Sequence, residues 1–389
     1  QITRQHHIRS HHHPVELCAS GTELLHDAAG RFVGPDVGVE RGSGVIRGYH
    51  FTLIVEPVGM VMILAADEVE SLCDPEVILP AVKHALVEQA ADNVERPDRI
   101  HFPVGSGRET SDPHGTGLTM PAYVHGEPYY ATKLASVHER NVSKGLPTIQ
   151  AQIALTDAKT GAPVAYMPGT RVTNVRTGCV GGLAVDALAA EPITLAVIGA
   201  GEQARWQTRA IAETSDLDAV AIYSPSESKY DCAADLRNEG IPAEAADTAT
   251  EAVSNATVVV TATTSTEPVF PADATDAELV VAVGAYEPAM QELEPGLIRR
   301  ADRIFADVPE EAIETGDLRE SSVRESDIVP LGDVFNDAAP IEPAGGLTLV
   351  KSVGSAVMDL TAATTVYNRA VDEGIQTEVS FENGESSSR

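Results

Sequence analysis

One lysine stands among apolar and small residues in Tyr129–Val137, a stretch whose composition predicts a β-strand. Burying the ammonium group of this residue, Lys133, costs free energy unless an anion or a substrate meets it. Lys133 is therefore a candidate catalytic group, although a side chain that reaches the surface explains the pattern equally well. A second cation, Arg176, lies near the start of a predicted helix of small residues that begins at Thr173. An anionic ligand would suit its guanidinium group, and ordinary surface placement is the alternative.

A glycine-containing turn is the second chemical signal. The apolar run Ile193–Ile198 predicts a strand, and the segment Glu202–Glu213 is compatible with a helix. Between them stand Gly199, Gly201 and Ala204, in the Gly-x-Gly-x-x-Ala spacing of a dinucleotide-binding βαβ unit. Glycines permit the tight turn and the close approach of a pyrophosphate, and the helix N-terminus attracts phosphate. We therefore predict NAD(P) binding rather than a purely structural turn.

The end of the next predicted strand, residues 219–223, bears on the choice between NAD and NADP. An NAD site normally has an acidic residue here for the ribose 2′-hydroxyl, whereas an arginine accommodates the 2′-phosphate of NADP. This chain has Ser224 and Ser226 instead. Because serine hydroxyls donate hydrogen bonds to phosphate, the sequence favours NADP(H) slightly over NAD(H).

The sequence predicts different secondary structure before and after the glycine turn, namely a helix and a β-hairpin before it and alternating strands and helices after it. Asp74 predicts the N-cap of a helix, and residues 149–155 and 163–167 predict a β-hairpin. After the glycine turn, apolar runs alternate with helical segments, which predicts a mainly parallel sheet. The strands predicted there are residues 219–223, 256–263, 279–284 and 303–307. Residues 348–373 then predict a strand, a turn at Gly354 and a helix.

Composition excludes several classes of function. The chain has 389 residues and a net charge of −31, which disfavours nucleic-acid binding because phosphate contacts need clustered Lys and Arg. The acidic residues are spread along the chain, so we interpret them as adaptation to a high-salt cytoplasm, where screening weakens self-repulsion. No apolar run reaches the ~18 residues that span a bilayer, so no membrane association is expected. The four cysteines lie far apart without metal-ligand spacing, so we predict a reducing compartment and no metal site.

The first 59 residues show no clear period. They contain five closely spaced histidines, namely His6, His7, His11, His12 and His13. A metal-binding tract is one interpretation, but we favour a disordered leader or a misassigned translation start, with Met60 or Met62 as the natural first residue. The segment lacks the apolar core of a secretory signal.

Many short motifs, in order from about Met62 to Val379, resemble the ornithine cyclodeaminase/μ-crystallin family, which also includes archaeal-type alanine dehydrogenases and imino-acid reductases. The matching motifs include Met120-Pro-Ala-Tyr123, Lys133, Gly145-Leu-Pro-Thr148, Thr173-x-x-Arg176-Thr, Gly199-x-Gly201-x-Gln203-Ala204, Thr261-Ala-Thr263-x-Ser265, Gly316-Asp317-Leu and Lys351-Ser-Val353-Gly354.

The resemblance implies an α/β fold in which a Rossmann dinucleotide-binding domain is inserted into a split α+β substrate and dimerisation domain. Residues 60–189 and 345–376 would form the substrate domain, and residues 190–344 the Rossmann domain. Residues 377–389 would be a polar tail. The resemblance also implies a homodimer that binds a small amino or imino acid.

The resemblance further implies a role for each site residue. Arg99 and Arg176 would bind the substrate carboxylate, and Lys133 would polarise the reacting group or transfer a proton. The predicted substrate pocket includes Met120, Tyr286 and Gly354. The predicted cofactor contacts are Gly199, Gly201, Gln203, Ala204, Ser224, Ser226, Thr263, Ser265, Val283 and Val353.

One departure from the family pattern limits the chemistry. Cyclodeaminase members carry an aspartate shortly after the fourth Rossmann strand, where it handles the amine or the attacking water, but this chain has Tyr286 there. A phenol of pKa about 10 cannot replace a carboxylate base at neutral pH. We therefore interpret the chain as an NAD(P)-dependent oxidoreductase acting at the Cα–N bond of a small amino or imino acid, with pyrroline-2-carboxylate reduction as the favoured form. Ornithine cyclodeamination with catalytic NAD+, alanine dehydrogenation and a non-catalytic μ-crystallin-like ligand binder are the alternatives.

Overall fold

The computed structural model describes residues 43–46, 49–52, 60–108, 111–319, 321–336, 345–375 and 377–380. The chain separates into two compact units, residues 1–58 and 59–389. In the first unit, β1 (Ser43–Ile46) pairs antiparallel with β2 (Tyr49–Thr52), so part of the predicted leader forms a hairpin. The five leader histidines lie outside the described residues.

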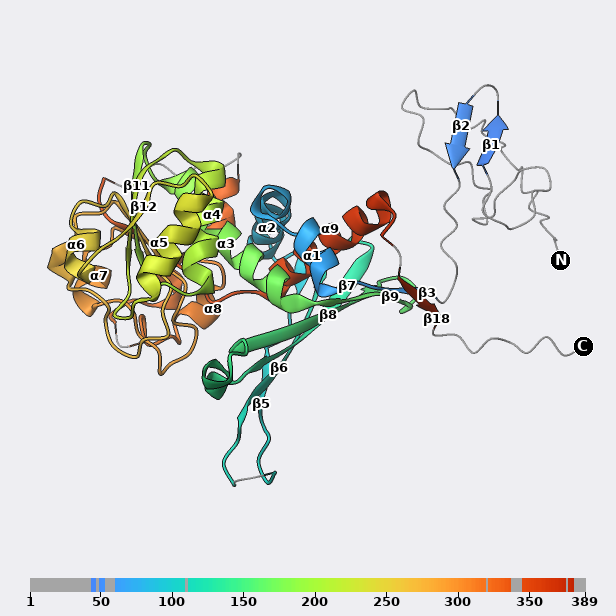
Figure 1. The fold of residues 1–389 in the computed structure, drawn as a ribbon, viewed down its shortest axis with the longest axis horizontal. Helices are drawn as coiled ribbons and strands as arrows, with labels where there is room; N and C mark the ends of the chain where they lie inside the picture. The colour runs from blue at the N-terminus through green and yellow to red at the C-terminus, as the bar shows by residue number, and fades with distance from the viewer. Residues whose placement is uncertain are drawn as a thin grey trace, which may run out of the picture. The chain divides into compact units, whose positions relative to one another are not determined.

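In the second unit, a mostly antiparallel sheet carries Lys133 (Figure 1). Its strand order is β18-β3-β9-β8-β7-β6-β4, with β5 paired to β6. The strands are β3 (Met60–Ile63), β4 (Val94–Glu95), β5 (Ile100–Val104), β6 (Gly115–Val124), β7 (Tyr129–Val137), β8 (Ile149–Asp157), β9 (Pro163–Pro168) and β18 (Glu378–Ser380). The predicted hairpin is confirmed, because β8 and β9 pair antiparallel.

Helices cover one face of this sheet, where the alternate apolar residues of β6, β7 and β8 are buried (Figure 1). The helices that contact the sheet are α1 (Ala66–Leu72), α3 (Gly169–Leu188) and α9 (Ala356–Glu373), and α2 (Pro75–Ala90) packs against α3 and α9. Helix α2 begins as predicted, since the Asp74 side chain accepts a hydrogen bond from the Val77 amide and Pro75 occupies the first position.

The other sheet of this unit is parallel throughout, as predicted, with strand order β12-β11-β10-β13-β14-β17-β15-β16. Its strands are β10 (Ile193–Ile198), β11 (Leu217–Tyr223), β12 (Ala243–Ala245), β13 (Val258–Thr261), β14 (Leu279–Ala282), β15 (Arg303–Ala306), β16 (Ile328–Pro330) and β17 (Thr348–Lys351). The order β12-β11-β10-β13-β14 is that of a Rossmann fold, with the first strand of the unit in the middle. Its helices are α4 (Glu202–Thr214), α5 (Ser228–Asn238), α6 (Ala249–Val253), α7 (Pro295–Arg300) and α8 (Pro309–Ala312).

Helices α3 and α4 join the two sheets through close packing. Glycines on α3 permit this approach, because a Cβ at Gly178 would meet the backbone of Trp206 on α4. The Trp206 ring is stacked between two guanidinium groups, with the Cζ of Arg171 4.1 Å and that of Arg209 4.4 Å from its centroid. The two sheets are therefore connected by a tightly packed helix pair.

Two predicted boundaries are wrong. Residues 348–351 were assigned to the substrate domain, but they form β17 between β14 and β15 of the parallel sheet. The polar tail was expected to begin at residue 377, but β18 pairs with β3 and extends the other sheet. Both errors concern strands too short for their pairing partners to be inferred from local pattern.

Candidate active site

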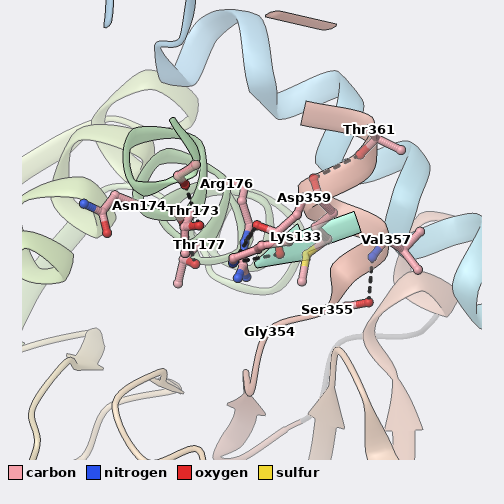
Figure 2. A network of polar contacts seen from close by, with 12 residues as sticks. Lys133, Thr173, Asn174, Arg176, Thr177, Gly354, Ser355, Val357, Asp359 and Thr361 are labelled. Atoms are coloured by element: carbon pink, nitrogen blue, oxygen red, sulfur yellow. Dashed lines mark hydrogen bonds and ion pairs between the residues drawn. The ribbon is translucent and has the colours of Figure 1, made fainter. Parts of the chain in front are cut away.

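Three charged side chains meet between β7, α3 and α9, and we call them the cationic cluster (Figure 2). The Nζ of Lys133 donates to both carboxylate oxygens of Asp359, at 3.0 and 2.9 Å. The Nε of Arg176 donates to Oδ1 of the same carboxylate at 3.1 Å. Lys133, Arg176 and Asp359 are 3%, 4% and 1% exposed, so both cations predicted from sequence are buried and share one anion.

Local structure explains why these side chains meet. On β7 the residues alternate between faces, and Lys133 belongs to the set that faces the helices, opposite Met120 of β6. Met120 is 6% exposed and lies opposite Lys133, and its place in a substrate pocket stays a prediction. Helix α9 begins at an N-cap, Ser355, whose side chain accepts from the Val357 amide. This places Asp359 in the first helical turn, where a negative charge is favoured by the helix dipole.

Burial and mutual charge shift the pKa of both ends of the cluster. Burial lowers the pKa of Lys133 to about 8, against the opposing effect of Asp359 and with a smaller contribution from Arg176. Burial also opposes ionisation of Asp359, but Arg176 and Lys133 outweigh it and hold the pKa of this carboxyl below its usual value. Lys133 thus titrates close to neutral pH while Asp359 stays ionised, which suits proton transfer by the lysine.

The cluster has one donor left over. Two cations face one carboxylate, and the buried Nη1 of Arg176 has no hydrogen-bond partner within the described residues. The turn before α9 comes close to this guanidinium only because its residue is glycine. A Cβ at Gly354, whose φ is +81°, would lie 2.9 Å from Nη1 of Arg176. A net positive charge with a free donor predicts an anionic ligand such as a carboxylate.

Arg99 reaches the same turn from the other side. Its Nη2 donates to the carbonyl oxygen of Gly354 at 2.8 Å, and it pairs with Glu311 of α8. Its charge also acts on Lys133, whose pKa it helps to lower. Arg99 is 17% exposed and so more accessible than the cationic cluster. Arg99 and Arg176 therefore both lie at Gly354, and Lys133 is joined to Arg176 through Asp359. Arg99 is engaged by Glu311 rather than free.

The turn itself is held by Asp307, which follows β15. Its carboxylate accepts from the amides of Val353 and Gly354, each at 2.9 Å, and from the hydroxyl of Ser352 at 2.7 Å. Asp307 is 3% exposed. Val353 thus contributes its backbone to the wall between the parallel sheet and α9, and its predicted contact with a cofactor stays a prediction.

The glycine turn has the shape that a pyrophosphate requires. Gly199 follows β10 with a φ of +123°, and a Cβ there would collide with the carbonyl oxygen of Ala262. A Cβ at Gly201, in contrast, would meet nothing within 4 Å, so the side of the turn that faces outward is open. Helix α4 starts directly after Gly201 without a side-chain cap, which leaves its N-terminal amides to a ligand. Ala204 is fully buried, as close packing of helix and strand requires.

Three further predicted cofactor contacts, Gln203, Ser224 and Ser226, have polar side chains. Gln203 donates through Nε2 to the Asn174 side chain at 3.2 Å, and its buried Oε1 has no partner among the described residues. At the end of β11, the hydroxyl of Ser224 lies 3.1 Å from that of Ser226, which in turn lies 2.6 Å from that of Ser228. These residues fit a dinucleotide, with phosphates at the turn and the adenosine ribose at the serines.

The remaining predicted contacts follow β13 and β14. Thr263 and Ser265 lie after β13, where the Ser265 amide donates to the Thr263 hydroxyl at 3.2 Å. Val283 continues β14, its amide donating to the Thr261 carbonyl at 2.9 Å. Tyr286 is half-buried in the next turn, and burial, with Glu287 second, raises its pKa. Its phenol is neutral at physiological pH, as the sequence argument assumed.

Comparison with known proteins identifies the family. Residues 60–374 match the model of the ornithine cyclodeaminase/mu-crystallin family. The chain belongs to this family. Among curated relatives, it is 32% identical over 330 residues to the Delta(1)-pyrroline-2-carboxylate reductase of Bacillus cereus, a match that covers 82% of this chain and 100% of the relative.

Solved structures of family members resemble the fold closely. The Thermococcus litoralis Delta(1)-pyrroline-2-carboxylate reductase in complex with NADH and L-proline is 28% identical with a TM-score of 0.76, over 82% of this chain and 100% of that one. An archaeal alanine dehydrogenase dimer with bound NAD is 27% identical with a TM-score of 0.75, over 83% of this chain and 100% of that one. The resemblance inferred from short motifs is thus confirmed, together with a Rossmann domain beside a second domain.

Sequence reasoning missed Asp359 in this family member. The clue was available, because Asp359 is a single acid among apolar residues in residues 356–363 and raises the same question of burial as Lys133. The pairing itself joins residues 226 positions apart, which no local pattern indicates.

Within the described residues, no group of three or more His, Cys, Asp and Glu side chains is placed to hold a metal ion. In that same part of the chain, no helix is both long and apolar enough to cross a membrane.

Proposed function

We propose that this family member is a nicotinamide-dependent reductase of a small cyclic imino acid, with pyrroline-2-carboxylate as the favoured substrate. The observation that carries the proposal is the cationic cluster, in which a lysine that titrates near pH 8 and an arginine with a free donor share one buried acid. The broader class, an oxidoreductase of amino or imino acids, is that of the relatives compared above.

The residues divide the work as follows. Arg176, through its free Nη1, and Arg99 bind the substrate carboxylate and so fix the orientation of Cα. Lys133 supplies the proton that keeps the imine nitrogen cationic and electrophilic. Asp359 holds the Lys133 ammonium and the Arg176 guanidinium in place. The Gly199 turn and the N-terminal amides of α4 would hold NAD(P)H, which would supply the hydride.

Tyr286 is the reason for preferring reduction to cyclodeamination. Release of ammonia requires a group that manages the amine or activates water, and a neutral phenol with a raised pKa is a poor base for either task. Reduction of a preformed imine needs no such base. The proposal therefore depends on Tyr286 forming part of the pocket wall rather than acting as a proton acceptor.

The test is a set of parallel assays of nicotinamide absorbance. The purified chain is given NADPH or NADH with pyrroline-2-carboxylate, piperideine-2-carboxylate, or pyruvate plus ammonia, and separately ornithine plus NAD+. We expect loss of reduced cofactor with the cyclic imines. Activity only with pyruvate and ammonia would make the protein an alanine dehydrogenase, and proline formation from ornithine without net absorbance change would make it a cyclodeaminase. Cofactor binding without any turnover would leave a ligand-binding protein.

We further propose a preference for NADP(H), because Ser224, rather than an acid, directly follows β11, and its hydroxyl begins a chain that continues to Ser226 and Ser228. Lys229 does not contribute, since its Nζ is buried and donates to the Ala246 carbonyl at 2.8 Å. A Ser226→Asp variant is expected to lower kcat/KM with NADPH about tenfold or more, since one lost charge-assisted hydrogen bond is worth about 1.5–3 kcal/mol, and to spare NADH. An equal effect on both cofactors would refute the assignment.

We also propose that the outer face of the Lys133 sheet is covered by a second copy of the chain. The register places alternate residues of β6, β7 and β8 on this face, and all of them are uncharged, although 22% of the chain is charged. Its exposed large side chains include Ile100, Phe102, Tyr130, Leu134 and Tyr166. An uncharged sheet face with several exposed large apolar side chains, on so acidic a protein, is typical of an interface between subunits. Light scattering should give the mass of a dimer, and Leu134→Glu should give a monomer; a monomeric wild type would refute the proposal.

Finally, we propose that the chain is adapted to high salt. A net charge of −31 repels itself, and screening weakens this repulsion as ionic strength rises. Circular dichroism during dialysis from molar KCl should show unfolding at low salt. Full retention of structure there would refute this interpretation, and all assays above should begin in molar KCl.

A further inference from the structure

Glu292 is a fully buried acid that the proposed reaction does not use. Its carboxylate accepts four hydrogen bonds from two separate loops. Oε1 accepts from the amide and the hydroxyl of Thr263, at 2.7 and 2.9 Å. Oε2 accepts from the amides of Gly284 and Ala285, at 2.8 and 3.1 Å. One side chain therefore binds the loop after β13 to the loop after β14.

These two loops lie where a cofactor must pass. Strands β13 and β14 are adjacent and parallel, and ligands of such sheets bind beyond the carboxyl ends of the strands. In the sheet, β11 lies on one side of β10, and β13 and β14 lie on the other. If the serines after β11 bind the adenosine ribose, the nicotinamide end of the dinucleotide lies on the β13 and β14 side. Ala285 directly precedes Tyr286, and the loop after β13 also touches the glycine turn through Ala262.

The surroundings of Glu292 hold its side chain in place. Asp317 accepts from the amides of Glu292 and Leu293, at 2.7 and 2.8 Å, and pairs with Lys351 of β17 at 2.9 Å. Burial, the largest effect, raises the pKa of Glu292, Lys351 lowers it, and Asp317 raises it. We call Glu292, Asp317 and Lys351 the acidic cluster. The four donors of the two loops stabilise the buried Glu292 carboxyl group in place of solvent.

We propose that Glu292 is a positioning residue for the redox end of the cofactor site: by tying Thr263 to Gly284 and Ala285 it sets the place of Tyr286 opposite the cationic cluster. The role rests on the proposed function. Close packing around the tie supports it, because a Cβ at Gly284 would lie 2.5 Å from Oε1 of Glu292 and would collide with the Thr263 carbonyl oxygen. The loops are therefore fitted to this carboxylate and to each other.

The sharpest variant is Glu292→Gln, which keeps shape and removes acceptors. The amide of glutamine has one oxygen, which accepts hydrogen bonds, and one NH2 group, which only donates them. The loop whose donors then face the NH2 group loses its hydrogen bonds to residue 292 and is no longer held. Glu294→Gln is the matched control. Glu294 lies two residues along the same segment and accepts from the Ala272 amide, away from both loops.

The first measurement uses the ligand-free protein. Amide hydrogen exchange at Thr263, Gly284 and Ala285 should accelerate in Glu292→Gln and remain unchanged in Glu294→Gln. The second measurement is the fluorescence lifetime of bound NADH. We expect a shorter lifetime in Glu292→Gln with a dissociation constant within about threefold of wild type, because the glycine turn that holds the phosphates is intact.

The third measurement is turnover at saturating substrate. We expect kcat to fall about 10- to 100-fold in Glu292→Gln, because a displaced reacting group slows the chemical step by such a factor. The kinetic isotope effect measured with 4-deuterated NADH should become larger. Unchanged exchange and lifetime would overturn the inference. So would a loss of thermal stability with normal kcat, which marks a purely structural acid. If wild type binds NADH but reduces no imine, the proposed function fails, while exchange and lifetime still decide the role of Glu292.

Discussion

The cationic cluster and the acidic cluster are both almost fully buried, yet their charges are balanced in opposite ways. In the cationic cluster two cations share the carboxylate of Asp359, and one arginine donor has no partner in the described structure. In the acidic cluster Lys351 pairs with Asp317 and acts on Glu292 through its charge alone, and loop amides occupy the oxygens of Glu292. Each cluster is paired internally, but the cationic cluster has one cation in excess and the acidic cluster has one carboxylate in excess.

This difference suggests that the cationic cluster binds a ligand and that the acidic cluster holds the surrounding loops in place. A buried donor without a partner, such as Nη1 of Arg176, gains free energy when a ligand supplies an acceptor. A carboxylate such as that of Glu292, which already accepts four hydrogen bonds, instead resists any change around it. The cationic cluster should therefore respond to ligand and to pH, and the acidic cluster should respond mainly to mutation. Four perturbations test this contrast.

The largest effect is expected for Lys133→Met, which removes the ammonium and keeps the length of the side chain. Loss of a group that transfers a proton costs about 10²- to 10⁴-fold in rate. We expect kcat with pyrroline-2-carboxylate to fall by that factor, with the cofactor dissociation constant unchanged. Lys83→Met, an exposed lysine on α2, is the control and should behave as wild type. A variant with normal kcat would remove Lys133 from the mechanism.

The next effect concerns stability. Asp359→Asn leaves two buried cations without their anion, a type of change that costs about 3–5 kcal/mol. Asp317→Asn should cost less, because Glu292 still acts on Lys351. Urea unfolding in molar KCl measures both values. If Asp359→Asn and Asp317→Asn lowered the free energy of unfolding equally, the proposed difference in charge balance between the two clusters would be refuted.

A smaller effect is expected from pH. The pKa of Lys133 is about 8 in the folded protein, so the rate of imine reduction should fall above that pH, by about tenfold per unit. The lowered pKa means that the unfolded chain binds this proton more readily between about pH 8 and 10.5. This group therefore favours folding increasingly as pH rises through that window. A reduction rate that stays level to pH 10 would contradict the assignment of Lys133 as proton donor.

The smallest effect should come from Glu311, which is partly exposed and pairs with Arg99. Ion pairs of this kind contribute about 0–1 kcal/mol, so Glu311→Gln should leave stability nearly unchanged. Because Arg99 loses a competing anion, the KM for the imino acid should fall by a few-fold at most. A loss of stability as large as that of Asp359→Asn would place Glu311 with the buried clusters instead.

The sequence predicted features that depend on local pattern. The turn at Gly199, the strand that carries Lys133 and the parallel sheet each follow from glycine placement or hydrophobic periodicity, and all are observed. Partnerships across long stretches of chain were missed. The sequence around Asp359 does not predict that Lys133 is its partner, and the sequence around Glu292 does not predict that it joins two loops. Strand β17 was misplaced for the same reason, since its neighbours β14 and β15 are distant in sequence.

The stacked ring of Trp206 has a practical consequence. It is the single tryptophan of the chain, and it lies on α4, the helix that begins at the Gly199–Gly201 turn, where we propose that the cofactor binds. Excitation of tryptophan therefore reports on this one place, held between two guanidinium groups. Tryptophan emission overlaps the absorption of reduced nicotinamide, so titration with NADH or NADPH will quench it by energy transfer. The protein thus carries its own optical probe of cofactor binding, without any label.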